Sequence, residues 1–158
     1  MTDSHDHLGR VDDAIKEFRA LGITELIHCG DTVSPFTVLR FKDAGFTRMV
    51  FVRGNNDGEL IYLEKIIKNV GGEFHKPPVF LETAGLKFAL LHEPMPHDAM
   101  RALPVDVVCY GHTHDIDIST DTRPLIINPG ESCGWLKGKA TIATLDTETM
   151  EVALIELA

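Results

Sequence analysis

The stretch Val107–His114 constrains the fold of this chain more than any other part of the sequence. It begins as an apolar, β-prone run, reaches Gly111, and then presents His112 and His114 two positions apart. Residues i and i+2 of an extended segment point to the same side, so both imidazoles can face one point in space. Neutral imidazole is the commonest side-chain metal ligand. The stretch therefore predicts a metal site at the end of a buried strand.

Three further apolar runs also end in polar residues. These ends are Gly30-Asp31, Gly54-Asn55-Asn56-Asp57 and the single His92. Ligand sites of open α/β sheets lie beyond the carboxyl ends of the strands, and glycine lets the backbone turn sharply there. Scattered structural polar residues would not be expected to fall at strand ends this consistently. We therefore expect these side chains to converge on the two histidines.

Apolar periodicity predicts three strand–helix alternations followed by hairpins. We expect helices at 9–21, 35–44, 60–70 and 97–103. We expect strands at 26–29, 49–52, 79–83, 87–91, 107–110, 125–127, 140–145 and 152–157. Because no linker or repeat interrupts this order, it indicates a single α/β domain over residues 1–158, with two sheets and helices outside them.

Composition and charge exclude several classes of protein. With 44% hydrophobic and 25% charged residues, the chain is ordinary for a globular protein, and no apolar run approaches the ~18 residues that span a bilayer. Three cysteines without a CxxC spacing, and no signal-peptide pattern, predict a reducing cytoplasm. A net charge of −9 argues against general binding of nucleic acid. Bound cations, rather than basic side chains, would have to attract a phosphate.

The candidate metal ligands are carboxylate, amide and imidazole groups without thiolate. They are Asp3, His5, Asp31, Asn55, His92, His112 and His114. Such a set suits divalent Mn, Fe, Zn, Ni or Co better than a cysteine-rich structural zinc. Seven ligands are too many for one tetrahedral ion but suit two ions that share a bridge, and the carboxylate of Asp31 is the obvious bridge. Two such ions would lower the pKa of a water between them and supply hydroxide at neutral pH.

Taken in order, these motifs resemble those of the calcineurin-like metallophosphoesterases. The matching residues are Asp3-x-His5, Gly30-Asp31, Gly54-Asn55-x-Asp57, His92 and Gly111-His112-x-His114. Asn128-Pro129-Gly130 and the tail hairpin are similar to the small single-domain bacterial and archaeal phosphodiesterases of that superfamily. The resemblance implies a four-layer α/β/β/α sandwich with two mixed sheets. It also implies a hydrolase that acts on small phosphate esters, most readily diesters.

The same resemblance implies how the residues divide their roles. One ion would be held by Asp3, His5, Asp31 and His114, and the other by Asp31, Asn55, His92 and His112. Asp31, Asn55 and Asp57 would be the catalytic residues, and Mn²⁺ the favoured metal. A hydroxide that bridges the two ions would attack phosphorus in line.

Two positions depart from the pattern of the family. Many relatives have a histidine after the ligand asparagine, where it can protonate the leaving group, and this chain has Asn56. We therefore expect better activity on esters with activated leaving groups. The family also has a strand before the Asp-x-His motif, whereas only two residues precede Asp3. We expect that strand to be missing or truncated, the support of Asp3 and His5 to be weak, and an unpaired edge that would allow two copies to pair.

The sequence leaves other interpretations open. Relatives with the same fold, such as the retromer subunit, act as protein-binding scaffolds, so a non-catalytic metal-binding or interaction module is the alternative function. Asp57 could cap a helix, and His28, inside an apolar strand, fits a hydrogen-bonded core histidine. Glu131 and Cys133 could line the pocket or simply continue a loop.

Overall fold

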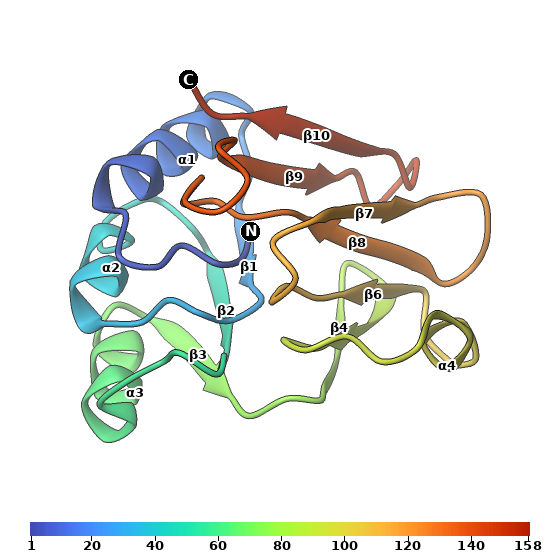
Figure 1. The fold of residues 1–158 in the computed structure, drawn as a ribbon, viewed down its shortest axis with the longest axis horizontal. Coiled ribbons are helices and arrows are strands. Elements are labelled where there is room, and N and C mark those ends of the chain that lie inside the picture. Colours follow the sequence, from blue (N-terminus) through green and yellow to red (C-terminus); the bar gives the residue numbers. More distant parts are fainter.

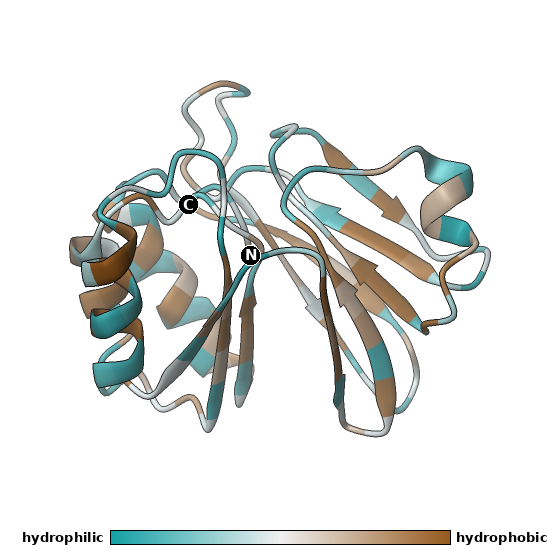
Figure 2. Ribbon diagram, turned by 90° about the horizontal axis from the view of Figure 1, so that it is seen from below, coloured by the Kyte–Doolittle hydropathy of each residue, from teal (hydrophilic) through white to brown (hydrophobic).

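Four layers, in the order helix, sheet, sheet, helix, make up the chain in the computed structural model, which describes residues 1–158 (Figure 1). The helices are α1 (Leu8–Ala20), α2 (Pro35–Arg40), α3 (Leu60–Asn69) and α4 (His97–Arg101). The strands are β1 (Glu25–His28), β2 (Arg48–Val52), β3 (Gly72–His75), β4 (Val79–Thr83), β5 (Leu86–Leu90), β6 (Val107–Cys109), β7 (Ile116–Ser119), β8 (Leu125–Pro129), β9 (Thr141–Leu145) and β10 (Val152–Glu156). Figure 2 shows α1, α2 and α3 outside one sheet and α4 outside the other. The predicted four-layer sandwich is therefore confirmed.

The two main sheets differ in how their strands are connected. The first sheet has the order β1-β2-β3, and all its strands are parallel, so the expectation of two mixed sheets is wrong for this one. Parallel neighbours need a crossover, which α2 and α3 provide. The second sheet has the order β4-β5-β6-β8-β7, with β4 and β7 antiparallel to their neighbours at its edges. The remaining strands, β9 and β10, form an antiparallel hairpin.

Alternation of side chains along the strands divides the core into three apolar clusters. Met49 and Phe51 of β2 pack against the helices, whereas Val50 and Val52 pack between the two sheets. On the far side of the second sheet, Met100 of α4 covers a third cluster. Strands that are buried on both faces read as continuous apolar runs, which explains why β2 was clear from the sequence.

Three elements of the structure differ from the prediction. Helix α2 ends at Arg40, not near Ala44, because the chain continues as turns after Phe41. Strands β3 and β7 were not predicted, since the glycine that opens β3 and the polar residues of β7 obscure any alternation of apolar side chains. Both strands lie at the edge of their sheets, where burial is incomplete and the apolar signal is weak.

The N-terminal residues are held firmly, in contrast to the weak support that we expected. No strand is assigned before α1, but the N–H of Cys29 donates to the carbonyl of Met1 (3.0 Å) and that of Asp3 donates to Gly30 (3.0 Å). On the opposite side, the N–H of Ser132 donates to the carbonyl of Thr2 (3.1 Å). This segment therefore lies between β1 and the loop after β8, and the side chain of Asp3 is fully buried.

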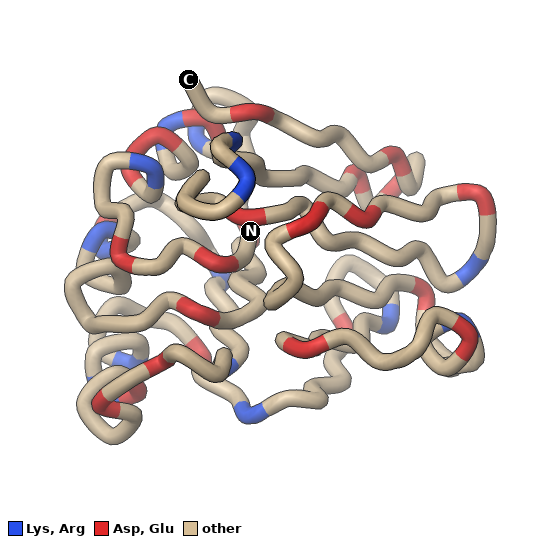
Figure 3. Tube along the Cα trace, viewed as in Figure 1, with Lys and Arg blue, Asp and Glu red and all other residues tan.

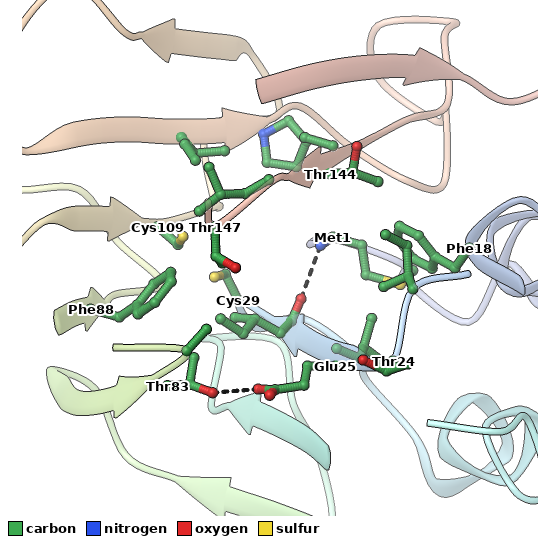
Figure 4. A pocket seen from close by; sticks show the side chains of 18 of the residues that line it. Met1, Phe18, Thr24, Glu25, Cys29, Thr83, Phe88, Cys109, Thr144 and Thr147 are labelled. Carbon is green, nitrogen blue, oxygen red and sulfur yellow. Dashed lines mark hydrogen bonds between the residues drawn. The ribbon is translucent and has the colours of Figure 1, made fainter. Parts of the chain in front are cut away.

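A cavity of 350 Å³ lies beside the N-terminal segment, and residues of β1 and β9 line it (Figure 4). Strand β9 has an unpaired edge, whereas the outer edge of β1 is partly hydrogen-bonded by the N-terminal segment. The amino group of Met1 donates to the carbonyl of Ile27 (2.9 Å) in this cavity, and burial lowers the pKa of that amino group. Pairing of two copies through such edges stays a prediction. No helix of the structure combines the length and apolar character that crossing a membrane requires.

Candidate metal centre

All seven candidate ligands meet where the two sheets end. They come from the N-terminal segment and from the turns that follow β1, β2, β5 and β6. Ligand atoms of Asp3, Asp31 and His92 all lie within 4.8 Å of one another, and the same holds for Asp3, His5 and His114. The expected convergence of strand ends therefore places groups that are far apart in the sequence around one small volume.

The first group of ligands surrounds Asp3. His5 Nε2 lies 3.8 Å from Asp3 Oδ1 and 3.4 Å from Asp31 Oδ2. His114 Nε2 lies 3.5 Å from Asp3 Oδ1. The rings of His5 and His114 are stacked, with centroids 5.0 Å apart. Two carboxylates and two imidazoles thus converge, as four ligands of one cation would.

The second group surrounds Asn55. Its Oδ1 lies 2.8 Å from His92 Nε2 and 2.9 Å from His112 Nδ1. His92 Nε2 lies 3.4 Å from Asp31 Oδ1. Asp31 therefore presents Oδ1 to this group and Oδ2 to the first one. A carboxylate placed in this way is suited to bridge two cations.

The electrostatics of these groups fit divalent cations. His5 Nε2 is buried without a hydrogen-bond partner, which is costly unless a ligand compensates it. Burial alone would raise the pKa of Asp31, but contacts with His92 and Asn56 hold it well below its usual range, so this side chain is a carboxylate. Burial alone would lower the pKa of His92, yet contact with Asp31 outweighs it and raises that pKa to about 9. The negative charge that holds a proton on His92 is also what would attract a cation.

Two glycines are required by close approach of the backbone to this centre. A Cβ on Gly54 would lie 2.1 Å from Asp31 Oδ1, and a Cβ on Gly111 would lie 1.9 Å from Thr2 Oγ1. Neither position can carry a side chain without displacing a segment of the site. The glycines that the sequence places before Asn55 and His112 therefore allow the ligand-bearing turns to pack together.

The backbone of the ligand residues is itself unusual. Five candidate ligands have a positive φ: Asp3 (50°), His5 (39°), Asp31 (57°), His112 (68°) and His114 (59°). For residues with a side chain this region is sparsely populated and costs roughly 1–3 kcal/mol each. Such conformations persist only when the surroundings impose them, and they cluster at functional sites.

Asn56 and Asp57 contact the centre in different ways. The backbone N–H and the Nδ2 of Asn56 donate to the two oxygens of Asp31 (2.8 Å and 2.7 Å). The carboxylate of Asp57 accepts from the N–H groups of Gly54 (2.6 Å) and Val33 (2.7 Å). Asp57 does not cap a helix, because α3 begins at Leu60 after a cap at Glu59. It fixes the turn that carries Asn55, and its predicted catalytic role stays a prediction.

The functional importance of Glu131 was not resolved from the sequence. Its buried carboxylate lies 2.5 Å from His114 Nδ1 and accepts from the N–H groups of Leu136 (2.8 Å) and Lys137 (2.6 Å). Cys133 Sγ lies 3.6 Å from the same carboxylate. No periodicity marks a loop residue of this kind. The only available signal was an acidic residue directly after the Asn-Pro-Gly turn.

Two other polar residues support the loops around the centre. Asn128 Nδ2 donates to the carbonyl of Gly111 (3.3 Å) and to Thr113 Oγ1 (3.0 Å), which anchors the turn that carries the two histidines. His28 is fully buried and lies 3.0 Å from Ser4 Oγ. It is therefore a hydrogen-bonded core residue and does not join the ligand groups.

A two-sheet α/β sandwich with adjoining clusters of Asp, His and Asn at its strand ends defines the metallophosphoesterase class of proteins. Residues 1–150 match the sequence-family model for the calcineurin-like phosphoesterase superfamily domain. The chain therefore belongs to this superfamily.

Its relatives include phosphoester-cleaving enzymes. Phosphodiesterase MJ0936 of Methanocaldococcus jannaschii is 37% identical over 161 residues, which cover 99% of this chain and 96% of that protein. A solved archaeal phosphodiesterase superposes with a TM-score of 0.91 at 36% identity, covering 99% of this chain and 97% of its own. The phosphoesterase YfcE of E. coli shares the fold, with a TM-score of 0.59, 17% identity, and coverage of 99% and 97%. Family membership and the similarity to a phosphodiesterase over the full length support a hydrolase that acts on phosphate esters.

Proposed function

We propose that this chain is a phosphodiesterase that hydrolyses small phosphate diesters with two divalent cations, Mn²⁺ being favoured. The observation that carries this proposal is the division of seven ligand side chains into two groups that share Asp31. The full-length similarity to a phosphodiesterase supports a diester as substrate. When bound, the cations would supply positive charge for the phosphate and a water of lowered pKa for in-line attack.

The residues of the chain would prepare the site for this chemistry. Glu131 holds the proton of His114 on Nδ1, which leaves the lone pair of Nε2 directed towards Asp3. Asn56 donates to both oxygens of Asp31 and so stabilises its negative charge. The left-handed backbone of five ligand residues fixes their directions before any cation binds.

The leaving group would depart without a proton from position 56. Asn56 cannot act as an acid at neutral pH, and its amide is occupied with Asp31. We therefore expect kcat/KM to rise steeply as the pKa of the leaving alcohol falls. Rates measured on a series of aryl and alkyl methyl phosphates provide the test, and a Brønsted plot without slope would refute this part of the proposal.

The main experiment measures hydrolysis of bis-p-nitrophenyl phosphate by Mn²⁺-loaded protein, together with the metal content of each sample. We expect turnover by the wild type and its loss in Asp31→Ala, because both ligand groups lose their shared carboxylate. Asp12→Ala is the matched control, since Asp12 forms an exposed ion pair with Arg40 (2.8 Å) on the helical side of the molecule. Equal rates in wild type and Asp31→Ala would eliminate the enzyme. If the protein binds Mn, Fe, Zn, Ni or Co but shows no turnover with any of them, the result would favour the alternative of a non-catalytic metal-binding scaffold.

The cellular setting belongs to the same proposal. We infer a cytoplasmic location, supported by three cysteines that are all free thiols. A small phosphate ester, rather than a nucleic-acid backbone, would be the binding partner, because the net charge is −9.

A further inference from the structure

An open groove of 520 Å³ begins at Asn55 and His92 and extends beside the metal centre. The segments that follow β2 and β5, and the one that joins β3 to β4, form its walls. Two of the lining residues are basic, Arg53 and Lys76, and one is acidic, Glu93. The groove is therefore continuous with the candidate ligands, and it is also lined by charged groups, Arg53, Lys76 and Glu93, that the proposed chemistry does not use.

The two basic side chains lack carboxylate partners. Neither Arg53 nor Lys76 takes part in any ion pair of the structure, although acidic residues outnumber basic ones, 24 to 15. Arg53 is partly buried. Its backbone N–H donates to the carbonyl of His75 (2.8 Å), the last residue of β3, and Lys76 follows directly after that residue. Figure 3 shows basic positions at this end of the first sheet, including the segment that joins β3 to β4. Two basic residues that line one groove and have no carboxylate partner are suited to bind an anion.

We propose that this groove binds a second anionic group of the substrate, a phosphate or carboxylate on the ester group that stays attached to phosphorus. The inference rests on the proposed phosphodiesterase function. In-line displacement expels the leaving group opposite the attacking water, so the retained ester group lies to the side of that axis. The groove begins at Asn55 and His92, so it adjoins the volume in which the phosphate would bind. The substrate class is therefore a phosphodiester that carries at least one further negative charge.

The charges of the groove make the proposal specific. Arg53 offers a planar fork of donors that matches a phosphate or carboxylate, and Lys76 adds a mobile point charge. Glu93 is exposed on the same groove and opposes an incoming anion. Removal of a basic residue and removal of Glu93 should therefore shift substrate preference in opposite directions.

The experiment compares three substrates with the same leaving group on Mn²⁺-loaded protein: methyl, 3-phosphopropyl and 2-carboxyethyl p-nitrophenyl phosphate. We expect kcat/KM to be at least about tenfold higher for one or both of the substrates with a second anion, and this ratio to fall as salt is added. The phosphate and carboxylate arms identify which anion the groove prefers. Equal kcat/KM for all three substrates would overturn the proposal.

Variants locate the effect. Lys76→Met and Arg53→Met should each lower the ratio of kcat/KM between a substrate with the second anionic group and the methyl substrate towards one, whereas Glu93→Gln should raise it. Lys68→Met is the matched control, because Lys68 is paired with Glu64 (2.6 Å) on the exposed side of α3, and its ratio should equal that of the wild type. A preference that survives both Arg53→Met and Lys76→Met would also overturn the proposal.

A binding measurement separates this inference from the proposed function. Titration calorimetry with propyl phosphate and propane-1,3-diyl bisphosphate does not require turnover. We expect the bisphosphate to bind at least about tenfold more tightly, and Lys76→Met to reduce that difference. If no substrate turns over but this difference is present, the proposed enzyme fails and the anion site stands. If turnover is normal and the difference is absent, the anion site fails and the enzyme stands.

Discussion

Glu131 provides the sharpest test of how the protein prepares its ligands. Its carboxylate is fully buried and serves three donors at once, the imidazole of His114 and the backbone N–H groups of Leu136 and Lys137. Burial alone would raise the pKa of Glu131, but these hydrogen bonds hold it below its usual value, so the group stays ionised. An anion at this position keeps the proton of His114 on Nδ1 and leaves Nε2 free to bind a cation.

Glu131→Gln cannot satisfy the three donors, although it has the same size. If the amide oxygen faces His114, its NH₂ group meets two backbone N–H groups, which leaves buried donors unpaired at a cost of about 1–3 kcal/mol each. If the NH₂ group faces His114, it donates to Nδ1, and the proton moves to Nε2, the atom needed for metal binding. Loss of an outer partner of a metal ligand typically costs about 10–100-fold in metal affinity, which is about 1.4–2.7 kcal/mol.

The assay is a calorimetric titration of metal-free protein with Mn²⁺ for the wild type and Glu131→Gln. We expect one of two binding events to weaken by about 10–100-fold and the other, which involves Asn55 and His112, to change far less. Glu148→Gln, at an exposed position in the turn before β10, is the control. Unfolding by urea in the presence of a chelator distinguishes lost metal affinity from lost stability. Wild-type affinity for both ions in a folded Glu131→Gln protein would refute the reasoning.

Three other substitutions test the packing and hydrogen bonding of buried residues in and near the candidate centre. Gly54→Ala would place its Cβ 2.1 Å from Asp31 Oδ1, so we expect it to abolish turnover of bis-p-nitrophenyl phosphate, whereas Gly58→Ala, whose nearest contact is 3.8 Å away, should keep it. Asp57→Asn must turn an NH₂ group towards one of two backbone donors, and we expect urea denaturation of metal-free protein to show a loss of about 1–3 kcal/mol. Burial lowers the pKa of His28 to about 3 in the folded protein, whereas the ordinary pKa of histidine in the unfolded chain is 6.5. Below pH 6.5 the unfolded chain therefore binds a proton that the folded protein does not, and the free energy of unfolding decreases as the pH is lowered. Between pH 7 and pH 5 we expect His28→Gln to lose about 2 kcal/mol less than the wild type, measured by urea denaturation with a chelator present.

Each of these expectations has an outcome that contradicts it. Full activity in Gly54→Ala would mean that the turn can move away from Asp31 without harm to the site. An Asp57→Asn protein as stable as the wild type would show that water satisfies the two N–H groups. For His28, parallel loss of stability in both proteins on acidification would mean that His28 can accept a proton in the folded state.

The fold was predictable where strands are buried on both faces. β2, β6 and β8 carry continuous apolar runs, and each was expected from the sequence alone. β3 and β7 were missed because each mixes glycine or polar residues with few apolar ones, and neither has a fully buried side chain. The end of α2 was placed too late because Phe41 and Ala44 are buried apolar residues at helical spacing, although the backbone there forms turns. Periodicity reports burial more directly than it reports hydrogen bonding.

The candidate centre was predictable because four separate apolar runs end in potential metal ligands. Carboxylates and imidazoles directly after apolar runs indicate a site even without knowledge of distances. Glu131 gave no such signal, since its role depends on a loop that folds back so that Leu136 and Lys137 donate to it. The same holds for Arg53 and Lys76, which become neighbours of the centre only through the packing of β2 against β3.

The segments that carry the candidate ligands are held in place by hydrogen bonds to one another rather than by any single ligand residue. Five ligand residues in left-handed conformations together cost on the order of 5–15 kcal/mol, as much as the net stability of a typical domain. This cost must be offset by contacts that hold the segments to one another. The carboxylate of Asp3 accepts from the N–H of His112 (3.0 Å) and from Thr2 Oγ1 (2.6 Å), and its backbone bonds to Gly30 and Cys133. Because each ligand-bearing segment is fixed by its neighbours, the cations would meet ligands that are already in place, and a change that loosens one segment should weaken the whole centre.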